Sequence, residues 1–255
     1  MAQHFAARLR ARETIIGYWV TTDNPPATER IARAGYDYVC LDLQHGLLDQ
    51  RGALAGVMAT ELGSSTGVIR VPANDPALIG KALDTGARAV IVPLVNTAAD
   101  AAQAARACRY PPGGVRSFGP MRSGLTIGFA PREADEQVAC IVMIETPEGL
   151  RNVAEICAEP GIDAIYVGPS DLALAIGGQT PQEGWQRPEY QQALTAIRAA
   201  AADAGKACGL HVNDGNAAAK ALADGFDFVS ISNDLNHITA FTRTELDRAR
   251  KGRNA

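Results

Sequence analysis

Short apolar runs alternate with alanine-rich helical stretches eight times along this chain of 255 residues. The runs are rich in Val, Ile and aromatic residues, and most lack a polar residue at every second position. That pattern is typical of parallel strands covered on both faces. The expected strands are Thr14–Val20, Tyr36–Leu43, Gly67–Pro72, Ala87–Leu94, Val138–Glu145, Asp163–Gly168, Ala207–Asn213 and Asp227–Ser232. Eight strands alternating with helices predict an α/β fold of the (β/α)₈ TIM barrel type.

The stretches between the strands carry helix signals at both ends. The expected helices are Pro25–Ala34, Leu48–Leu62, Pro76–Thr85, Ala98–Arg109, Pro147–Ala158, Pro188–Ala204, Gly215–Asp224 and, as the eighth of the barrel, Asn233–Lys251. Proline opens several of them, where its missing N–H costs nothing. Left-handed glycine caps are expected at Gly35, Gly63, Gly86, Gly205 and Gly225.

No linker or strong repeat divides the chain, so we expect one domain over residues 1–255. Two stretches, Tyr110–Gln137 and Gly177–Arg187, are longer than a barrel needs. Long loops in a compact barrel are usually lids or interface arms.

Charge and composition exclude several classes of function. Lys and Arg total 24 against 28 Asp and Glu, a net charge of −4, which does not fit a nucleic-acid binder. No apolar run approaches the ~20 residues that span a bilayer, so no membrane partner is expected. The five cysteines form no CxxC pair and are interpreted as core residues in a reducing, cytoplasmic compartment.

Polar residues gather where the predicted strands end, which is the face that carries chemistry in a barrel. Glu145 and Asp171 follow consecutive strands, and two converging carboxylates repel unless a cation lies between them. Mg²⁺, Mn²⁺ or Co²⁺ would suit such oxygen ligands. The alternative is that both residues cap helices.

Arg70 and His45 occupy the same predicted rim. A buried Arg70 needs an anion, either a substrate carboxylate or enolate, or an internal salt bridge with Asp42 or Asp84. His45 lies three residues after Asp42, and an Asp–His pair is typical of a general base, although a histidine bonded within its loop fits as well.

The other three histidines and the four lysines give less evidence of a catalytic role. His211 ends a strand and points either to the site or to the core, whereas His4 and His237 fall in terminal helices. No glycine-rich nucleotide motif follows a strand, so no nucleotide cofactor is expected. No lysine is expected to form a Schiff base, because all of them fit helices, strand starts or the terminus: Lys81, Lys206, Lys220 and Lys251.

Several motifs in fixed order resemble one family. They are LDLQHG (Leu41–Gly46), RVP (Arg70–Pro72), KALDTGARAVIVP (Lys81–Pro93), RYPPGGVRS (Arg109–Ser117), MIETPEGLRNVAEI (Met143–Ile156) and GIDAIYVGPSDLA (Gly161–Ala173). From about Ile16 to Ser232 the chain resembles the HpcH/HpaI family of metal-dependent, class II pyruvate aldolases of aromatic-compound degradation.

The resemblance implies roles for particular residues. Glu145 and Asp171 would hold the divalent metal, which a 2-oxo acid chelates, and Arg70 would stabilise the enolate oxygen. The Asp42–His45 pair, supported by Asp84, would assist the base that takes the 4-hydroxyl proton. The expected substrate-binding positions are Gln44, Arg70, Gly168, Pro169, Ser170 and Asp171, with the backbone N–H groups of Ser170 and Asp171 on the carboxylate.

Two positions depart from the family pattern. Gln44 stands where relatives often have Glu, and Met143 where they often have Gln. Both changes lower the polarity or charge near the metal, and they favour a hydroxylated donor such as hydroxypyruvate as an option beside pyruvate.

The implied activity is reversible retro-aldol cleavage of 4-hydroxy-2-oxo acids to pyruvate or hydroxypyruvate and an aldehyde. The resemblance also implies a homohexamer, a trimer of dimers whose last helix is exchanged between subunits, with the Tyr110–Gln137 stretch reaching a neighbouring site. The alternatives are an acyl-CoA lyase of the citrate lyase β or malyl-CoA lyase type and a non-catalytic metabolite-binding barrel.

Overall fold

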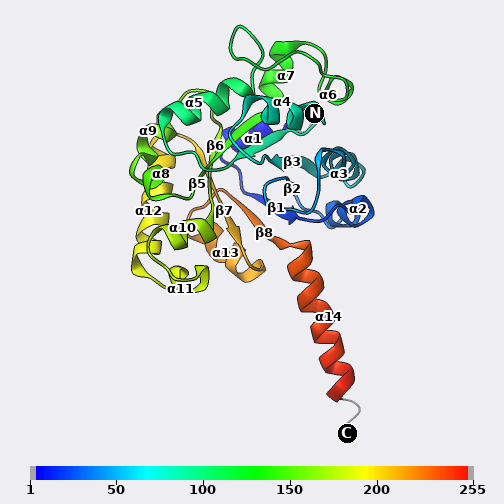
Figure 1. Cartoon of the computed structure of the whole chain (residues 1–255), viewed down its shortest axis with the longest axis vertical. Coiled ribbons are helices and arrows are strands. Elements are labelled where there is room, and N and C mark those ends of the chain that lie inside the picture. The colour runs from blue at the N-terminus through cyan, green and yellow to red at the C-terminus, as the bar shows by residue number, and fades with distance from the viewer. Residues whose placement is uncertain (1–3, 252–255) are drawn as a thin grey trace.

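The computed structural model describes residues 4–251 and contains a closed barrel of parallel strands in the order β1 to β8 (Figure 1). The strands are β1 (Ile15–Val20), β2 (Tyr38–Asp42), β3 (Thr66–Arg70), β4 (Ala89–Val92), β5 (Ala139–Ile144), β6 (Ala164–Val167), β7 (Ala207–Val212) and β8 (Phe228–Asn233). The predicted (β/α)₈ barrel is therefore confirmed. The expected domain boundaries, 1 and 255, lie outside the described residues.

Helices surround the barrel and fill the two long stretches (Figure 1). They are α1 (Phe5–Arg10), α2 (Pro25–Ala32), α3 (Gln50–Leu62), α4 (Pro76–Asp84), α5 (Ala98–Ala107), α6 (Ser123–Thr126), α7 (Pro131–Gln137), α8 (Pro147–Arg151), α9 (Val153–Ala158), α10 (Pro169–Ala175), α11 (Pro181–Trp185), α12 (Pro188–Asp203), α13 (Gly215–Ala223) and α14 (Asp234–Lys251). The helix expected over Pro147–Ala158 is interrupted at Asn152, whose φ of −96° and ψ of 9° leave the helical region. The stretches expected as long loops hold α6, α7 and α11.

Two backbone positions differ from the sequence-based expectation. Four of the five expected caps have positive φ, but Gly63 has φ −92° and Ser64 takes the left-handed conformation at φ 69°. Gly63 is instead required for space, because a Cβ there would lie 2.3 Å from the Cβ of Ala32. Strand β4 ends at Val92 rather than Leu94, because Pro93 has no N–H and Leu94 turns to φ 55°.

The barrel interior is filled from its N-terminal end by aromatic side chains. Tyr38, Tyr166 and Phe228 are fully buried there, and Phe5 of α1 closes the bottom with its ring centroid 5.5 Å from that of Tyr38. The hydroxyls of Tyr38 and Tyr166 both reach Ser230 Oγ, at 2.6 Å and 2.7 Å. Since these groups satisfy one another below, the space left in the barrel lies at the C-terminal ends of the strands.

A buried carboxylate ties the base of the barrel together. Asp163 accepts hydrogen bonds from Arg10 Nε at 2.7 Å, Arg109 Nη2 at 3.1 Å and the backbone N–H of Cys140 at 2.7 Å. It thereby connects α1, the end of α5, β5 and β6. The five cysteines are all buried and free, as their interpretation as core residues requires.

The last helix leaves the barrel rather than packing on it (Figure 1). Asp234 is the only buried residue of α14, and its carboxylate accepts hydrogen bonds from the backbone N–H groups and hydroxyls of Thr21 and Thr22. Burial alone would raise the pKa of Asp234, but these four donors hold it below its ordinary value. Among residues 4–251, no helix combines the length and the apolar character that crossing a bilayer requires.

We expect Asp163→Ala to lower the free energy of unfolding by about 3 kcal/mol, because it leaves Arg109 buried without its counter-charge. Urea unfolding at pH 7, followed by circular dichroism, measures the change. Asp224→Ala is the matched control: it removes an exposed pair with Lys220 and should change the free energy by less than about 0.5 kcal/mol. Equal effects of the two variants would contradict the role given to Asp163.

Candidate active site

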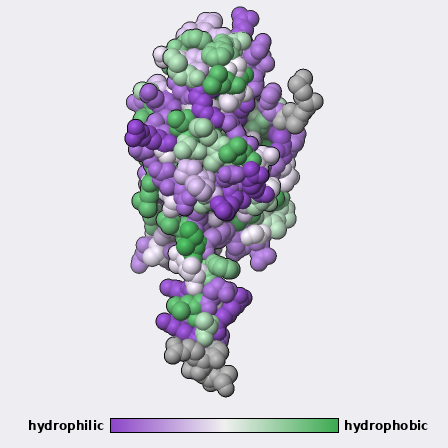
Figure 2. Space-filling model, turned by 90° about the vertical axis from the view of Figure 1, so that its right-hand side faces the viewer, coloured by the Kyte–Doolittle hydropathy of each residue, from purple (hydrophilic) through white to green (hydrophobic). Residues whose placement is uncertain are grey.

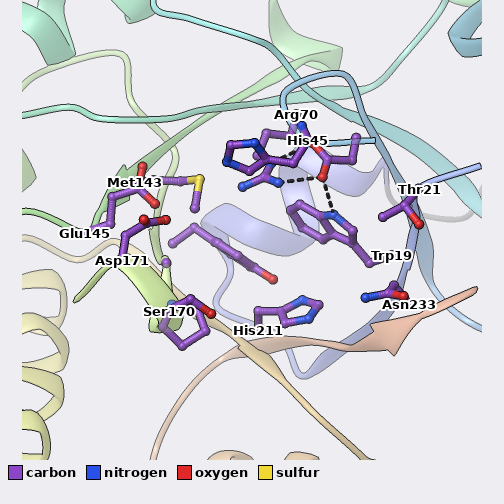
Figure 3. Close-up of a pocket in the computed structure, with 14 residues that line it drawn as sticks. Trp19, Thr21, His45, Arg70, Met143, Glu145, Ser170, Asp171, His211 and Asn233 are labelled. Carbon is purple, nitrogen blue, oxygen red and sulfur yellow. Dashed lines mark hydrogen bonds and ion pairs between the residues drawn. The ribbon is translucent and has the colours of Figure 1, made fainter. Parts of the chain in front are cut away.

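A cavity of about 250 Å³ opens at the C-terminal ends of the strands (Figure 3). Residues of every strand except β4, of the turn after β2 and of the first turn of α10 surround it. It includes His45, Arg70, Glu145, Ser170 and Asp171, so the structure brings together residues that the sequence places up to 126 positions apart. This is the face at which (β/α)₈ barrels bind their ligands.

Asp42 and Arg70 form a buried, two-point ion pair. They are opposite each other in the register of β2 and β3, and Asp42 accepts from Arg70 Nε at 2.8 Å and from Nη2 at 2.5 Å. Burial raises the pKa of the Asp42 carboxyl, but the bonds and charge of Arg70 outweigh it and bring the pKa below its ordinary value. Arg70 Nη1 makes no hydrogen bond within the described residues, so it remains a donor toward the cavity.

The expected Asp42–His45 side-chain pair is not formed. The Asp42 carboxylate accepts from the backbone N–H groups of Gln44 and His45, at 3.0 Å and 3.2 Å, whereas its remaining capacity is taken by Arg70 and by Trp19 Nε1 at 3.2 Å. The His45 ring lies exposed at the cavity rim instead (Figure 3).

Glu145 is buried at the end of β5 with one oxygen committed to the backbone. Its Oε1 accepts from the N–H of Leu94 at 2.8 Å, which the left-handed conformation of Leu94 turns toward it. Its Oε2 lies against Gly168, where a Cβ would approach within 2.1 Å, so a side chain at that position would displace the carboxylate. Burial, followed by the negative charge of Asp171, raises the pKa of Glu145 above its ordinary value against the opposing effects of the Leu94 N–H and Arg70.

Asp171 lies in the first turn of α10, beside Glu145 (Figure 3). Helix α10 begins at Pro169 directly after β6, with Gly168 as the preceding cap. The backbone N–H groups of Ser170 and Asp171 belong to that first turn and have no partner within their helix. Carboxylate oxygens and free amide donors thus border the same part of the cavity.

Asp84 does not reach this cavity, contrary to expectation. It lies at the C-terminal end of α4, at the opposite end of the barrel from the strand ends, and its Oδ1 accepts from Nη2 of the buried Arg116 at 2.9 Å. Gln44 also does not line the cavity: its side-chain oxygen is buried without a hydrogen-bond partner.

Part of the cavity wall was missing from the sequence-based set of site residues, namely Trp19, Thr21, Tyr166 and Asn233. Two more lining residues were considered without being assigned to the site: Met143, noted as a departure near the metal, and His211, left between the site and the core. The indole of Trp19 lies under the Arg70 guanidinium, 5.0 Å from its carbon, and its ring centroid is 5.3 Å from that of His211. All of them sit at or near the ends of strands, so the inward register of the strands was the signal that could have identified them.

Two carboxylates that meet a cavity next to unpaired amide donors and a free guanidinium nitrogen can hold a cation and an anionic substrate together. Among the described residues, no group of three or more His, Cys, Asp and Glu side chains is arranged to enclose a metal. A cation held by Glu145 and Asp171 would therefore keep most of its coordination positions open. Mg²⁺ is commonly bound in this way, through one or two carboxylates together with substrate and water.

Comparisons with known proteins agree with this geometry. Residues 15–240 match the family model described as HpcH/HpaI aldolase/citrate lyase. The chain is 39% identical over 233 residues to a hydroxypyruvate/pyruvate aldolase of Rhizorhabdus wittichii, covering 91% of this chain and 92% of that protein. It is 36% identical over 250 residues to a 5-keto-4-deoxy-D-glucarate aldolase of Klebsiella pneumoniae, covering 97% and 96%.

The fold agrees as well. The crystal structure of an HpcH/HpaI aldolase/citrate lyase family protein from Burkholderia cenocepacia superimposes with a TM-score of 0.89 at 34% identity, over 96% of this chain and 98% of that one. The matched residues extend across all eight strands of the barrel and every residue of the cavity. The chain therefore belongs to the HpcH/HpaI aldolase/citrate lyase family.

Proposed function

We propose that this protein is a divalent-metal-dependent aldolase that cleaves 4-hydroxy-2-oxo acids reversibly to pyruvate or hydroxypyruvate and an aldehyde. The observation that carries the proposal is the meeting of Glu145 and Asp171 beside Arg70 in one small cavity. The names of the aldolase relatives support the same reaction class.

The residues present fit a divalent cation. Glu145 is buried, its Oε1 is held by the N–H of Leu94, and its carboxylate forms no ion pair within the described residues. Asp171 brings a second charge to the same space, which oxygen-preferring cations such as Mg²⁺, Mn²⁺ or Co²⁺ would neutralise. Such a cation, when bound, would supply Lewis-acid polarisation of the 2-oxo group.

The chain's own groups then account for the remaining steps. The backbone N–H groups of Ser170 and Asp171 bind the substrate carboxylate. The imidazole of His45 accepts the proton of the 4-hydroxyl group as the C3–C4 bond breaks, and Arg70 Nη1 donates to the enolate oxygen that receives the electron pair. The proton held by His45 is afterwards available to C3 of the enolate, which completes the release of the 2-oxo acid.

Asp42 has a different role from the one expected of it. Because its carboxylate is bound to Arg70, Trp19 and the backbone of His45, it fixes the guanidinium and the turn that bears His45 rather than polarising the imidazole. We therefore propose Arg70 and His45 as the groups that touch the reacting atoms and Asp42 as the residue that positions both.

An acyl-CoA lyase is the second candidate within this family. It would need cations for the CoA phosphates, but three arginines between residues 109 and 132 are already paired with carboxylates. Arg109 pairs with Asp163, Arg116 with Asp84, and Arg122 with Glu61. The cavity of about 250 Å³ also suits a small acid rather than a thioester carrying CoA. A thioester-cleavage assay with malyl-CoA separates the two, and we expect no turnover.

Pyruvate release from a 4-hydroxy-2-oxo acid should stop after EDTA treatment and return with Mg²⁺ or Mn²⁺. Glu145→Gln, which keeps the size of the side chain and removes its charge, should lower kcat/KM by about 10³-fold, the loss expected when a fixed charge at the reacting centre is removed. Pyruvate formation coupled to lactate dehydrogenase measures both effects. Full activity after thorough chelation would overturn the metal dependence.

Arg70→Lys should lower kcat by about 10²-fold, because a lysine cannot both bind Asp42 at two points and donate to the enolate. Circular dichroism establishes that the variant remains folded. His237→Phe, a change outside the cavity, is the control and should keep its kcat. Unchanged turnover of Arg70→Lys and Arg70→Ala would favour a barrel that binds metabolites without catalysis.

We also propose that the protein assembles as a homohexamer, a trimer of dimers that exchange α14 between subunits. Apolar residues lie along one side of this helix and are exposed, namely Leu235, Ile238, Phe241 and Leu246. A second group of exposed apolar residues lies before α6, within it and in the loop that follows, namely Val115, Phe118, Met121, Leu125 and Phe129. Figure 2 shows hydrophobic side chains at that end of the molecule and on α14. A partner subunit would cover both surfaces, and we propose a cytoplasmic location for the assembly.

Phe241→Asp should convert the assembly to smaller species, because it places a charge in the apolar stripe of α14. Sedimentation velocity measures the size distribution. Ala240→Asp, on the opposite side of the same helix, should leave it unchanged. A wild-type protein that sediments as a monomer would contradict the proposed assembly.

A further inference from the structure

The cavity has two chemically different halves (Figure 3). Glu145 and Asp171 lie on one side, with Met143 beside them. Thr21, His211 and Asn233 lie on the other side, beyond the ring of Trp19. The first half holds the groups assigned above to the 2-oxo acid. The second half has no role in that chemistry.

His211 is a neutral imidazole whose ring nitrogens have no protein partner. It projects into the barrel from β7, packs edge-on against Trp19, and makes no hydrogen bond within the described residues. Burial, helped by the positive charge of Arg70, lowers its pKa to about 4. At neutral pH the ring therefore offers one N–H donor and one bare nitrogen acceptor.

The other two side chains of this half, Asn233 and Thr21, are oriented by hydrogen bonds to α14. Asn233 Oδ1 accepts the backbone N–H of Asn236 at 2.8 Å, so its Nδ2 group remains as a donor. Thr21 Oγ1 donates its proton to Asp234 Oδ1 at 2.6 Å, so its lone pairs remain as acceptors. Both side chains are partly buried, and both line the cavity.

This half of the cavity offers donors and acceptors without an available charge. Arg70 and Asp42 are the nearest ionised pair, and Asp42 takes two of the three guanidinium nitrogens. Asp234 lies behind Thr21, and its negative charge is bound to the hydroxyls and amides of Thr21 and Thr22. The wall therefore suits neutral groups that donate and accept at once, which is the property of a hydroxyl group.

We propose that Thr21, His211 and Asn233 form the acceptor subsite of this enzyme and that they bind the hydroxyl groups of a short, neutral, hydroxylated aldehyde. The inference rests on the proposed aldolase function and adds the class of aldehyde. An alkyl aldehyde would leave these partly buried polar groups unpaired, and a site built to bind a hydroxyl rejects the analogue that lacks it. An aldehyde that carries a carboxylate would meet no cationic side chain among these three residues.

Glycolaldehyde and propanal provide the test, because they differ only by a hydroxyl in place of a methyl group. With Mg²⁺ and saturating pyruvate, wild-type kcat/KM should favour glycolaldehyde by about 10²-fold. His211→Phe keeps an aromatic ring against Trp19 but removes both nitrogens, and it should reduce that preference at least tenfold with propanal turnover maintained. His211→Asn, which retains a donor and an acceptor, should keep part of the preference.

His237→Phe is the matched control, because His237 does not line the cavity. Its Nδ1 forms a hydrogen bond of 2.8 Å with the hydroxyl of Tyr18, and its replacement should not change the preference for glycolaldehyde. A wild-type enzyme without preference, or a His211→Phe variant that loses activity equally toward both aldehydes, would overturn the inference. Exchange of the pyruvate methyl hydrogens in D₂O, followed by NMR, reports enolate formation without any aldehyde. If the methyl hydrogens exchange but the enzyme does not prefer glycolaldehyde over propanal, only the proposed subsite is rejected. If there is neither hydrogen exchange nor aldol product, the proposed function is overturned and the subsite with it.

Discussion

The ion pair between Asp42 and Arg70 is the interaction on which the site depends. The register of β2 and β3 places the two residues opposite each other, so closing the barrel also forms the pair. Asp42 then distributes its remaining capacity between the indole N–H of Trp19 and the backbone of the turn that bears His45. The buried carboxylate of Asp42 thereby fixes the guanidinium of Arg70, the indole of Trp19 and the turn that bears His45. Buried ion pairs of this kind add little net stability. Removing one partner leaves the other charge buried without a counter-charge and lowers the free energy of unfolding by about 3–5 kcal/mol. The geometry of the cavity is therefore coupled to the integrity of the fold.

The opposite side of the cavity is held by backbone features that other residues would disturb. Leu94 adopts φ 55°, an unfavourable conformation for a residue with a side chain, and in return its N–H reaches Glu145 Oε1. Gly168 leaves room for Oε2 of the same carboxylate. These two backbone features position a buried carboxylate that forms no ion pair within the described residues. Stability is given up here for a carboxylate that is ready to bind, a trade that is common at functional sites.

The sequence predicted the barrel well because apolar runs and helix signals are local. It also predicted that His45, Arg70, Glu145 and Asp171 share one rim, since the ends of parallel strands meet there. Its errors concern which side chains contact one another. The expected Asp42–His45 side-chain pair is not formed, whereas the alternative salt bridge between Arg70 and Asp42 is confirmed, because strand register rather than chain proximity decides side-chain contacts. Asp84 was grouped with the site although it ends a helix, and barrel helices run back to the other end of the strands. His211 could not be assigned, since the inward or outward direction of one strand residue depends on register.

The barrel divides its tasks between two sets of strands. Strands β2, β3, β5 and the β6–α10 junction carry the charged groups, which are linked to one another and to the backbone. The second set consists of Thr21 after β1, His211 of β7 and Asn233 of β8. The ring nitrogens of His211 and Nδ2 of Asn233 make no hydrogen bond within the described residues, whereas the hydroxyl of Thr21 also holds Asp234. Replacing a charged residue leaves its partner without a counter-charge, whereas replacing His211 removes no hydrogen bond within the described residues and changes only what the cavity can bind. Acceptor preference can therefore change by substitution at the end of β7 without disturbing the groups that break the carbon–carbon bond.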